Sequence, residues 1–423
     1  MRKWLKRGAL TLLGVTVLAV AAWVGSFYYL EHALRKEIAQ LRADKILLTY
    51  DELVPPAPDA ENAAPVLREL VRTIVPPLDD LPRPSIFKAE LESNSEGMAR
   101  LADWTRKNEH VFSGMKDVIA KPQYRMEHPL LLLDIYNPDD KKIPLANLFK
   151  LYEAKIYLLF KNKNIGDAAN YIIDYLKFCI LYKKSCTSFS EYITTLVYSG
   201  MTIGYVDAIV SNHEITGAQL DGIAVLLNAL DIPQLIKQAI QGELIFEYSV
   251  VLSLANKDLS VLFSPKVLKA LYFYQHDGIF RDAPQYIEIA TSPFYMTRDK
   301  IDRLKEKHQS DLIPGHYTQI FPDNAFYPAT NIISRLDILR LKLAILRHMA
   351  KHRKLPASLQ EIDTSILPTV PRDAYNGKEY TYAIQGEESF MVSSETYELN
   401  TPEYFRIQPF NKKTASAPLA NRP

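Results

Sequence analysis

An uncharged apolar run from Gly8 to Leu30 limits the folds open to this chain more than any other part of its sequence. At a rise of 1.5 Å per residue, about 23 helical residues span roughly 34 Å, which is enough to cross the hydrocarbon core of a bilayer. The run closes with aromatic side chains of the kind that lie at the headgroup boundary: Trp23, Phe27, Tyr28 and Tyr29. We therefore predict one transmembrane helix over residues 8–30.

The charges before this run predict its orientation. Positively charged flanks are retained on the cytoplasmic side of a membrane, and the chain begins with a cluster of them: Arg2, Lys3, Lys6 and Arg7. We expect residues 1–7 to lie in a bacterial cytoplasm, the helix to cross the inner membrane once, and the bulk of the chain to fold outside the cytoplasm.

A cleavable signal peptide is the competing interpretation of the same segment. Its basic start, its apolar run and the small residues Ala19 and Ala21 fit that pattern. The apolar stretch continues past the cleavage point, which favours an uncleaved anchor. A buried helix of a soluble protein is the third interpretation, and the length and flanking charges disfavour it. No cysteine lies near the run, so lipid attachment through an N-terminal Cys is excluded.

The composition indicates a globular body and disfavours a polyanionic partner. The 423 residues are 48% hydrophobic and 23% charged, which is enough to bury a core. The formal net charge is +1, and no basic patch is interleaved with aromatic residues. Nucleic-acid binding is therefore not expected.

The chain contains two cysteines, Cys179 and Cys186. If both lie on one helix, seven residues separate their α-carbons by about 10 Å, beyond the reach of a disulfide. We expect both to be buried small apolar side chains. The alternative, a disulfide, requires a turn near residues 183–185.

Prolines and hydrophobic periodicity divide the rest of the chain, for which we predict a mainly α-helical fold. Strong helix formers over residues 31–50 extend the anchor into a stalk, and the stalk or linker region reaches residue 58. An irregular helical bundle or solenoid-like ectodomain follows over residues 59–330. A small α+β element with a β-hairpin occupies residues 331–410, and a disordered tail occupies residues 411–423.

Several boundaries inside these regions are predicted from local signals. Residues 90–121 are expected to be helical, and Asn147 to Leu230 carries the clearest apolar stripes. Two helices should meet at residues 164–167 with Asp167 as the N-cap, and Thr216 with Gln219 fits a capping box. Pro233 should end the helix that this box opens. A helix over residues 332–353 should precede strands near residues 380–384 and 390–392, joined at residues 386–388.

Residues 148–181 resemble a single tetratricopeptide-type helix pair. The residues that match this motif are Ala154, Tyr157, Gly166, Asp167 and Ala169. The resemblance implies two antiparallel helices joined by a tight turn. No second copy follows at the expected period, so a repeat array is not predicted.

Residues 332–394 resemble the long-helix-to-sheet passage of type II secretion pseudopilins. The matching residues are Leu355, Pro356, Leu359, Glu361, Pro371, Asp373, Tyr375 and Gly377. The preceding helix departs from that family because it follows a large domain and is polar, with Arg335, Asp337, Arg340 and Lys342. The calcium loop of the family also has no counterpart here. The overall order of segments is similar to uncharacterised membrane-anchored bacterial envelope proteins, a group that implies no activity.

His348 and His352 are spaced so that two imidazoles on one helix can hold a metal ion. Their neighbours repel a cation: Arg347, Lys351, Arg353 and Lys354. The Glu of a metalloprotease motif is also missing. A solvated basic helix face is therefore predicted instead of a metal site.

Other patterns that could indicate catalysis are weak. Ser85 and Lys88 match S-x-x-K without its companion motifs, and phosphate-binding, dinucleotide-binding and nucleophile-elbow motifs are absent. Three acidic pairs could include glycosidase carboxylates, but adjacent acids in loops are usually solvated: Asp79–Asp80, Asp139–Asp140 and Glu387–Glu388. Tyrosines in helical stripes fit packing better than an aromatic ligand groove, for example Tyr171, Tyr175 and Tyr182. We predict no catalytic, cofactor-binding or metal-binding residue.

These observations favour a protein-binding or assembly module of the cell envelope, held in the lipid bilayer through Gly8 to Leu30. The rival hypothesis is an envelope hydrolase acting on cell-wall glycan or peptide, since catalytic residues can be dispersed along a sequence. A third hypothesis is a component associated with a pseudopilus.

Overall fold

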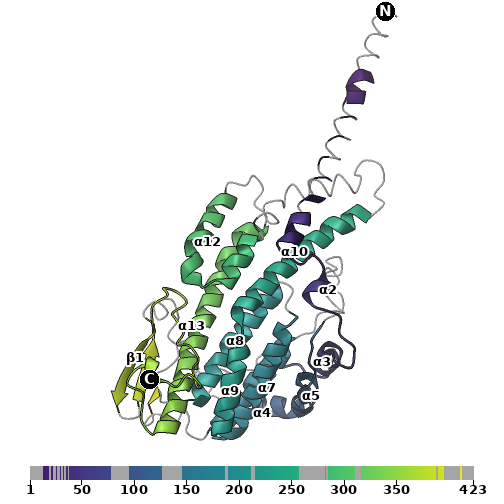
Figure 1. The fold of residues 1–423 in the computed structure, drawn as a ribbon. Helices are drawn as coiled ribbons and strands as arrows, with labels where there is room; N and C mark the ends of the chain where they lie inside the picture. The colour runs from purple at the N-terminus through teal and green to yellow at the C-terminus, as the bar shows by residue number, and fades with distance from the viewer. Residues whose placement is uncertain are drawn as a thin grey trace, which may run out of the picture.

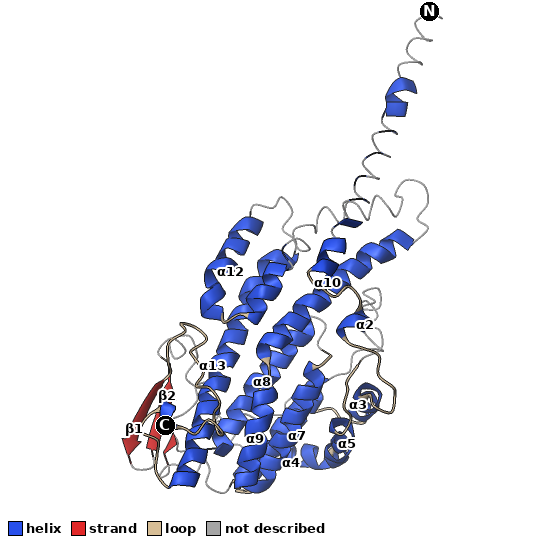
Figure 2. Ribbon diagram, in the orientation of Figure 1, coloured by secondary structure: helices blue, strands red, loops and turns tan. Residues whose placement is uncertain are grey.

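The computed structural model describes residues 13–18, 21, 25, 29, 32, 35–36, 38–77, 95–125, 145–185, 189–210, 215–256, 282, 284–309, 316–386, 389–394 and 410–411. The protein is mainly α-helical and has a small antiparallel sheet near its C-terminus (Figures 1 and 2). Its helices are α2 (Tyr50–Leu53), α3 (Ala63–Arg72), α4 (Ser95–Lys107), α5 (Glu109–Ile119), α6 (Leu145–Lys161), α7 (Ile165–Lys183), α8 (Phe189–Val210), α9 (Gly217–Ala229), α10 (Ile232–Asn256), α12 (Phe294–Gln309), α13 (His316–His352) and the short 3₁₀ helix η3 (Leu359–Glu361).

The helices predicted from the apolar stripes are present, and α7 packs against both α6 and α8. The stripe residues Phe149, Tyr152 and Ile156 of α6 are buried, and so are Tyr175 and Cys179 of α7. The rings of Tyr152 and Tyr175 stack with their centroids 5.3 Å apart. Aromatic packing between neighbouring helices therefore holds the middle of the body together.

The structure confirms one of the predicted helix caps and corrects two other predicted signals. Thr216 and Gln219 form the expected capping box at the start of α9. The N-cap of α7 is Asn164, whose side chain accepts a hydrogen bond from the Asp167 backbone, so Asp167 lies in the first turn instead. Pro233 does not end α9, because it lies in the first turn of α10. Backbone N–H groups in a first turn have no partner within the helix, so proline costs no hydrogen bond there.

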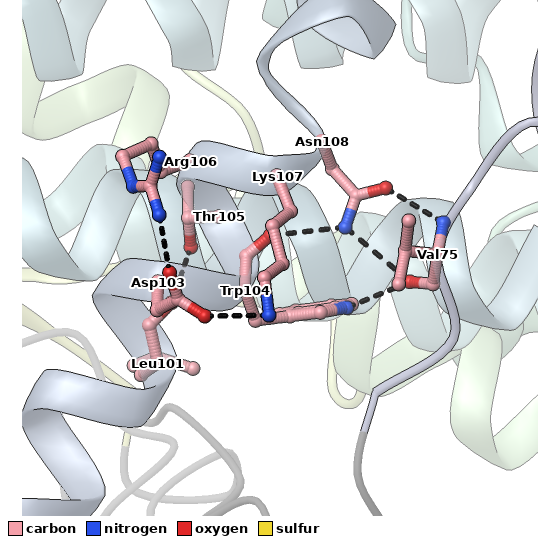
Figure 3. Close-up of polar contacts among 8 residues, drawn as sticks. All are labelled: Val75, Leu101, Asp103, Trp104, Thr105, Arg106, Lys107 and Asn108. Carbon is pink, nitrogen blue, oxygen red and sulfur yellow. Dashed lines mark hydrogen bonds and ion pairs between the residues drawn. The ribbon is translucent and has the colours of Figure 1, made fainter.

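A buried asparagine divides the helical region expected over residues 90–121 into α4 and α5. The side chain of Asn108 accepts from the backbone N–H of Val75 at 2.8 Å and donates to the Trp104 carbonyl at 3.0 Å. The Trp104 indole donates to the carbonyl of Val75 at 2.8 Å (Figure 3). The corner between the two helices is therefore tied to the segment that leaves α3, whereas Asp103, Arg106 and Lys107 form ion pairs on the exposed side.

The helix that contains residues 38–43 ends at Ala43, seven residues before the predicted end at Tyr50. Lys45 adopts a left-handed conformation with φ 59°, which stops the helix without a proline or a glycine. The segment expected to be a stalk or linker then packs on the body, because Ile46, Leu48 and Leu53 are buried.

Helix α13 begins at His316, so the domain boundary expected at residue 331 falls inside it. It runs beside α8, α9, α10 and α12, and its apolar residues belong to the same core as the other helices. Its polar side chains are not a solvated face, since Arg335, Asp337 and Lys342 are buried. The α-helix of the C-terminal segment is therefore part of the helical body.

The predicted β-hairpin is present in the C-terminal segment. Strand β1 (Thr381–Gly386) pairs antiparallel with β2 (Ser389–Ser393), with Tyr382 opposite Val392. A short third strand, β3 (Phe410–Asn411), pairs with β2 and includes the first residue of the tail expected to be disordered. Residues 412–423 lie outside the described part of the chain.

Candidate functional site

A cleft of about 290 Å³ opens between α9, the second half of α13 and the segment 366–371 that leads to the sheet. Two arginines, one aspartate and one asparagine line it among apolar side chains. The lining residues are Ala224, Asn228, Asp337, Arg340, Leu343, Ala344, Arg347, Ile366, Leu367, Pro368, Thr369 and Pro371. The volume and the mixed walls fit a small molecule or a few side chains of a partner.

Arg340 connects both helices of this cleft. Its guanidinium donates to the carboxylate of Asp337 at 3.0 Å and to the carbonyl of Leu227, in the last turn of α9, at 2.7 Å. Both contacts use the terminal nitrogens, while the buried Nε atom has no hydrogen-bond partner among the described residues. Arg340 is therefore held by both helices through its terminal nitrogens, and its Nε atom lies inside the protein.

Asp337 is buried beside Arg340 and is 6% exposed. Burial raises the pKa of this carboxyl to about 6, while the Arg340 guanidinium acts in the opposite direction. A carboxyl with such a pKa changes its charge just below neutral pH. The charge on this wall of the cleft therefore depends on pH in that range.

Arg347 forms the outer edge of the cleft, where it is paired with the exposed Asp221 at 2.9 Å. The opposite wall is held in place by Asp363. Its carboxylate accepts from the Ser365 backbone and from Lys351 at 2.8 Å each, contacts that lower its pKa. The backbone turn at Asp363 thus fixes the apolar residues of segment 366–368 against α13.

The lining of this cleft offers hydrogen-bond donors and apolar contacts to a bound group. A glycosidase needs two carboxyl groups, and the lining residues include one, which is paired with Arg340. Thr369 is the one hydroxyl residue among them, and no Ser, Cys, His or Lys lines the cleft beside it. Arginine and asparagine on apolar walls instead recognise carbonyl and carboxylate groups.

The predicted solvated basic helix face includes exposed residues, but His348 is not part of it. His348 is buried, with 3% of its surface exposed, while His352 and its basic neighbours Lys351, Arg353 and Lys354 are exposed. The two rings lie 4.4 Å apart between centroids. Burial lowers the pKa of His348, and the neighbouring His352 lowers it further. Within the described residues, no group of three potential metal ligands occurs.

The remaining candidate site residues either pack in the core or lie outside the described residues. Tyr175 and Tyr182 are buried in the core and Tyr171 is half-buried, and all three make ring contacts. Cys179 is a buried free thiol whose pKa burial raises to about 12. The candidates beyond the described chain are Ser85, Lys88, Cys186, Asp79–Asp80, Asp139–Asp140 and Glu387–Glu388.

Sequence reasoning missed the cleft, although a signal for one wall was present. Asp337, Arg340, Ala344 and Arg347 follow one another at spacings of three or four, which places them on one face of a helix. No comparable pattern identifies segment 366–371, because its position depends on the tertiary fold. No protein-family model matches the sequence, and neither a curated protein nor a solved structure is significantly similar to the chain.

Proposed function

We propose that this chain is a single-pass membrane-anchored envelope protein whose helical body binds a partner protein through the cleft between α9 and α13. The observation that carries the binding role is the composition of the cleft, in which Arg340 and Arg347, each paired with a carboxylate, lie among apolar side chains. Arginine beside apolar surface is enriched where proteins bind one another.

The apolar N-terminal helix supports the anchor. The described residues of the predicted span are helical, and Figure 1 draws residues 13–18 away from the other helices. Large apolar side chains are left 59% to 73% exposed there: Leu13, Val15, Val17, Leu18 and Tyr29. Because exposed apolar surface on this scale is unfavourable in water, a bilayer is the environment that suits it.

Two other segments of the described chain are apolar and long enough to cross a membrane, Glu191–Val210 and Gly217–Gly242. The first is α8, whose side chains are mostly buried against neighbouring helices. The second is interrupted between α9 and α10 at residues 230–231, so it is not one straight helix. The first segment therefore fits the core of the body better than a membrane span, and the break in the second argues against one straight span.

The residues of the proposed pseudopilin-like end form a compact turn before the hairpin. Gly377 has φ +71°, and an added Cβ would lie 2.7 Å from the ring of Tyr295. The Asp373 carboxylate accepts from the Tyr375 backbone, so the Pro-x-Asp-x-aromatic-x-Gly spacing forms a compact turn. The tetratricopeptide-like pair has weaker support, since Gly166 has open space where a closely packed turn would leave none.

A reporter fusion tests the anchor. An enzyme that is active only outside the cytoplasm is fused after Arg42, and a second fusion of a cytoplasm-only reporter at the same residue is the matched control. We expect activity from the first fusion alone, with the chain in the membrane fraction after alkaline washing. Activity from the cytoplasmic reporter would reject the orientation.

Photo-crosslinking tests the binding role. A photoreactive residue at Thr369, which lines the cleft, should capture a defined partner in intact membranes. Arg347→Ala should lower the yield at least fivefold, whereas Arg72→Ala, at an exposed pair with Glu69 far along the chain, should not change it. Equal yields for both variants would contradict a role of the cleft in binding.

A further inference from the structure

The junction between the anchor helix and the body is built from three separate attachments. The first is a closed helix end. Ile46 donates its backbone N–H to the carbonyl of Leu41 at 2.9 Å, and Lys45 donates to that of Arg42 at 3.1 Å. These are the two hydrogen bonds of a Schellman motif. Its apolar pair, Leu41 and Ile46, is 3% and 5% exposed and belongs to the main core.

The second attachment follows within three residues. Leu48 is 2% exposed, and its backbone N–H donates to the Glu52 carboxylate at 2.8 Å. Glu52 also accepts from the Thr49 backbone at 3.0 Å, and the Thr49 hydroxyl accepts from the Glu52 backbone N–H, which completes a capping box at the start of α2. These contacts lower the pKa of Glu52. The backbone between the first helix and α2 is thus hydrogen-bonded along most of its length.

The third attachment holds α2 against distant parts of the chain. Leu53 and Val54 pack against Ile245 of α10. On the other side, Arg125 forms an ion pair with Asp51 and lies 5.0 Å from the centroid of the Tyr50 ring. Apolar packing and charge therefore fix α2 from two directions.

We infer that the body is fixed to its anchor without a flexible linker, so that the cleft faces away from the bilayer and receives a water-soluble partner. This inference rests on the proposed anchor. Among the described residues after the predicted span, 32, 35–36 and 38–43 are helical, and Leu41 is the first that is buried in the core. At the rise of an α-helix, eleven residues after Leu30 correspond to about 16 Å from the hydrocarbon edge. Helix α13 runs from the anchor side of the body toward the end that carries the sheet (Figure 1). The cleft residues lie in the second half of that helix.

Amide hydrogen exchange tests whether the junction is rigid. The full chain is reconstituted in phospholipid nanodiscs, and residues 41–48 are compared with α3 in the core. We expect similar protection in both. Glu52→Ala should speed exchange at Leu48 and Thr49 at least tenfold, while Glu61→Ala, at an exposed side chain, should leave it unchanged. Exchange of residues 41–48 at the rate of an unstructured peptide would overturn the inference.

Energy transfer to labelled headgroups tests the direction of the cleft. A donor dye at Lys45 should transfer to acceptor lipids at least twofold more efficiently than one at Thr369, since both residues are exposed, Lys45 follows the helix that leads from the anchor, and Thr369 follows the far end of α13. Inserting a flexible Gly-Ser segment before Ile38 leaves the attachments intact and should reduce this difference. Equal transfer from both positions in the unmodified chain would contradict the inference.

Different results would overturn the proposed membrane anchor and the inferred rigid junction. A chain that does not enter nanodiscs overturns the anchor, and exchange at residues 41–48 in solution then still reports whether the junction is rigid. A chain that enters nanodiscs but exchanges rapidly at these residues keeps the anchor and overturns the rigid junction.

Discussion

At the scale of single residues, basic side chains end three of the described helices in the left-handed conformation. Lys45, Lys163 and Arg353 have φ values of 59°, 58° and 58°. This conformation costs a residue with a Cβ atom about 1 kcal/mol and is usually given to glycine. A cation next to the last carbonyls interacts favourably with the helix dipole, which offsets part of that cost.

Glycine at these positions should therefore stabilise the protein. We expect Lys163→Gly to raise the free energy of unfolding by about 0.5–1 kcal/mol, because the strain at the end of α6 is removed. Lys150→Gly, at an exposed position inside α6, should instead lower it by about 1 kcal/mol. Chemical denaturation of both variants measures the difference. A loss of stability in both would show that the cation at the helix end outweighs the strain.

His348 should make the protein sensitive to acid. Burial lowers its pKa, so the folded protein binds a proton less readily than the unfolded chain. Neutral His348 makes its full contribution to the free energy of unfolding above the pKa of histidine in the unfolded chain, about 6.5. This contribution is lost as the pH falls below that value.

The stability of the His348→Leu variant should consequently fall less between pH 6.5 and 5 than that of the unmodified protein. His110→Gln is the matched control, because its side chain is exposed and lies on α5 instead of α13. Denaturation midpoints across this pH range give the comparison. Parallel profiles for the unmodified protein and His348→Leu would assign the acid sensitivity to other groups.

At the scale of elements, a buried ion pair joins α8 and α13. Lys342 and Asp207 are 2.5 Å apart between Nζ and Oδ1, and their side chains are 2% and 7% exposed. Transfer of two charges from water to the protein interior costs free energy, and their mutual attraction offsets this cost only while both charges are present. The pair therefore specifies how the two helices align more than it adds to stability.

Single and double substitutions of this pair should differ accordingly. Asp207→Ala should destabilise the protein by about 3–5 kcal/mol, because it leaves a charged lysine in the core. The double variant Asp207→Leu with Lys342→Met should recover most of that loss. Glu69→Ala, which breaks an exposed pair with Arg72, should cost less than about 1 kcal/mol. A double variant no more stable than Asp207→Ala would contradict this account.

At the scale of the whole molecule, local signals predicted elements but not their burial. The capping box at Thr216 and the hairpin near Tyr382 depend on neighbouring residues, so the sequence was sufficient for both. The burial of Lys342 depends on Asp207, a residue 135 positions away. The cleft likewise combines residues from 224 to 371. Neither of these long-range contacts produces a periodic pattern or a motif that can be recognised in a single sequence.

Truncation at the anchor separates membrane attachment from the stability of the body. A chain that begins at Ile38 should be soluble without detergent, because the apolar run is gone while the closed helix end remains. A chain that begins at Asp44 also loses Leu41, the buried partner of Ile46, and should be less stable by about 2–5 kcal/mol.

Urea denaturation of the two truncated chains measures this difference. Gln40→Ala in the longer chain is the control, since Gln40 is exposed and forms a local hydrogen bond with Asp44. Its effect should stay within about 0.5 kcal/mol. Equal stability of the two truncated chains would mean that the last turn of the anchor helix is not part of the core, and the orientation of the body would then be free to vary.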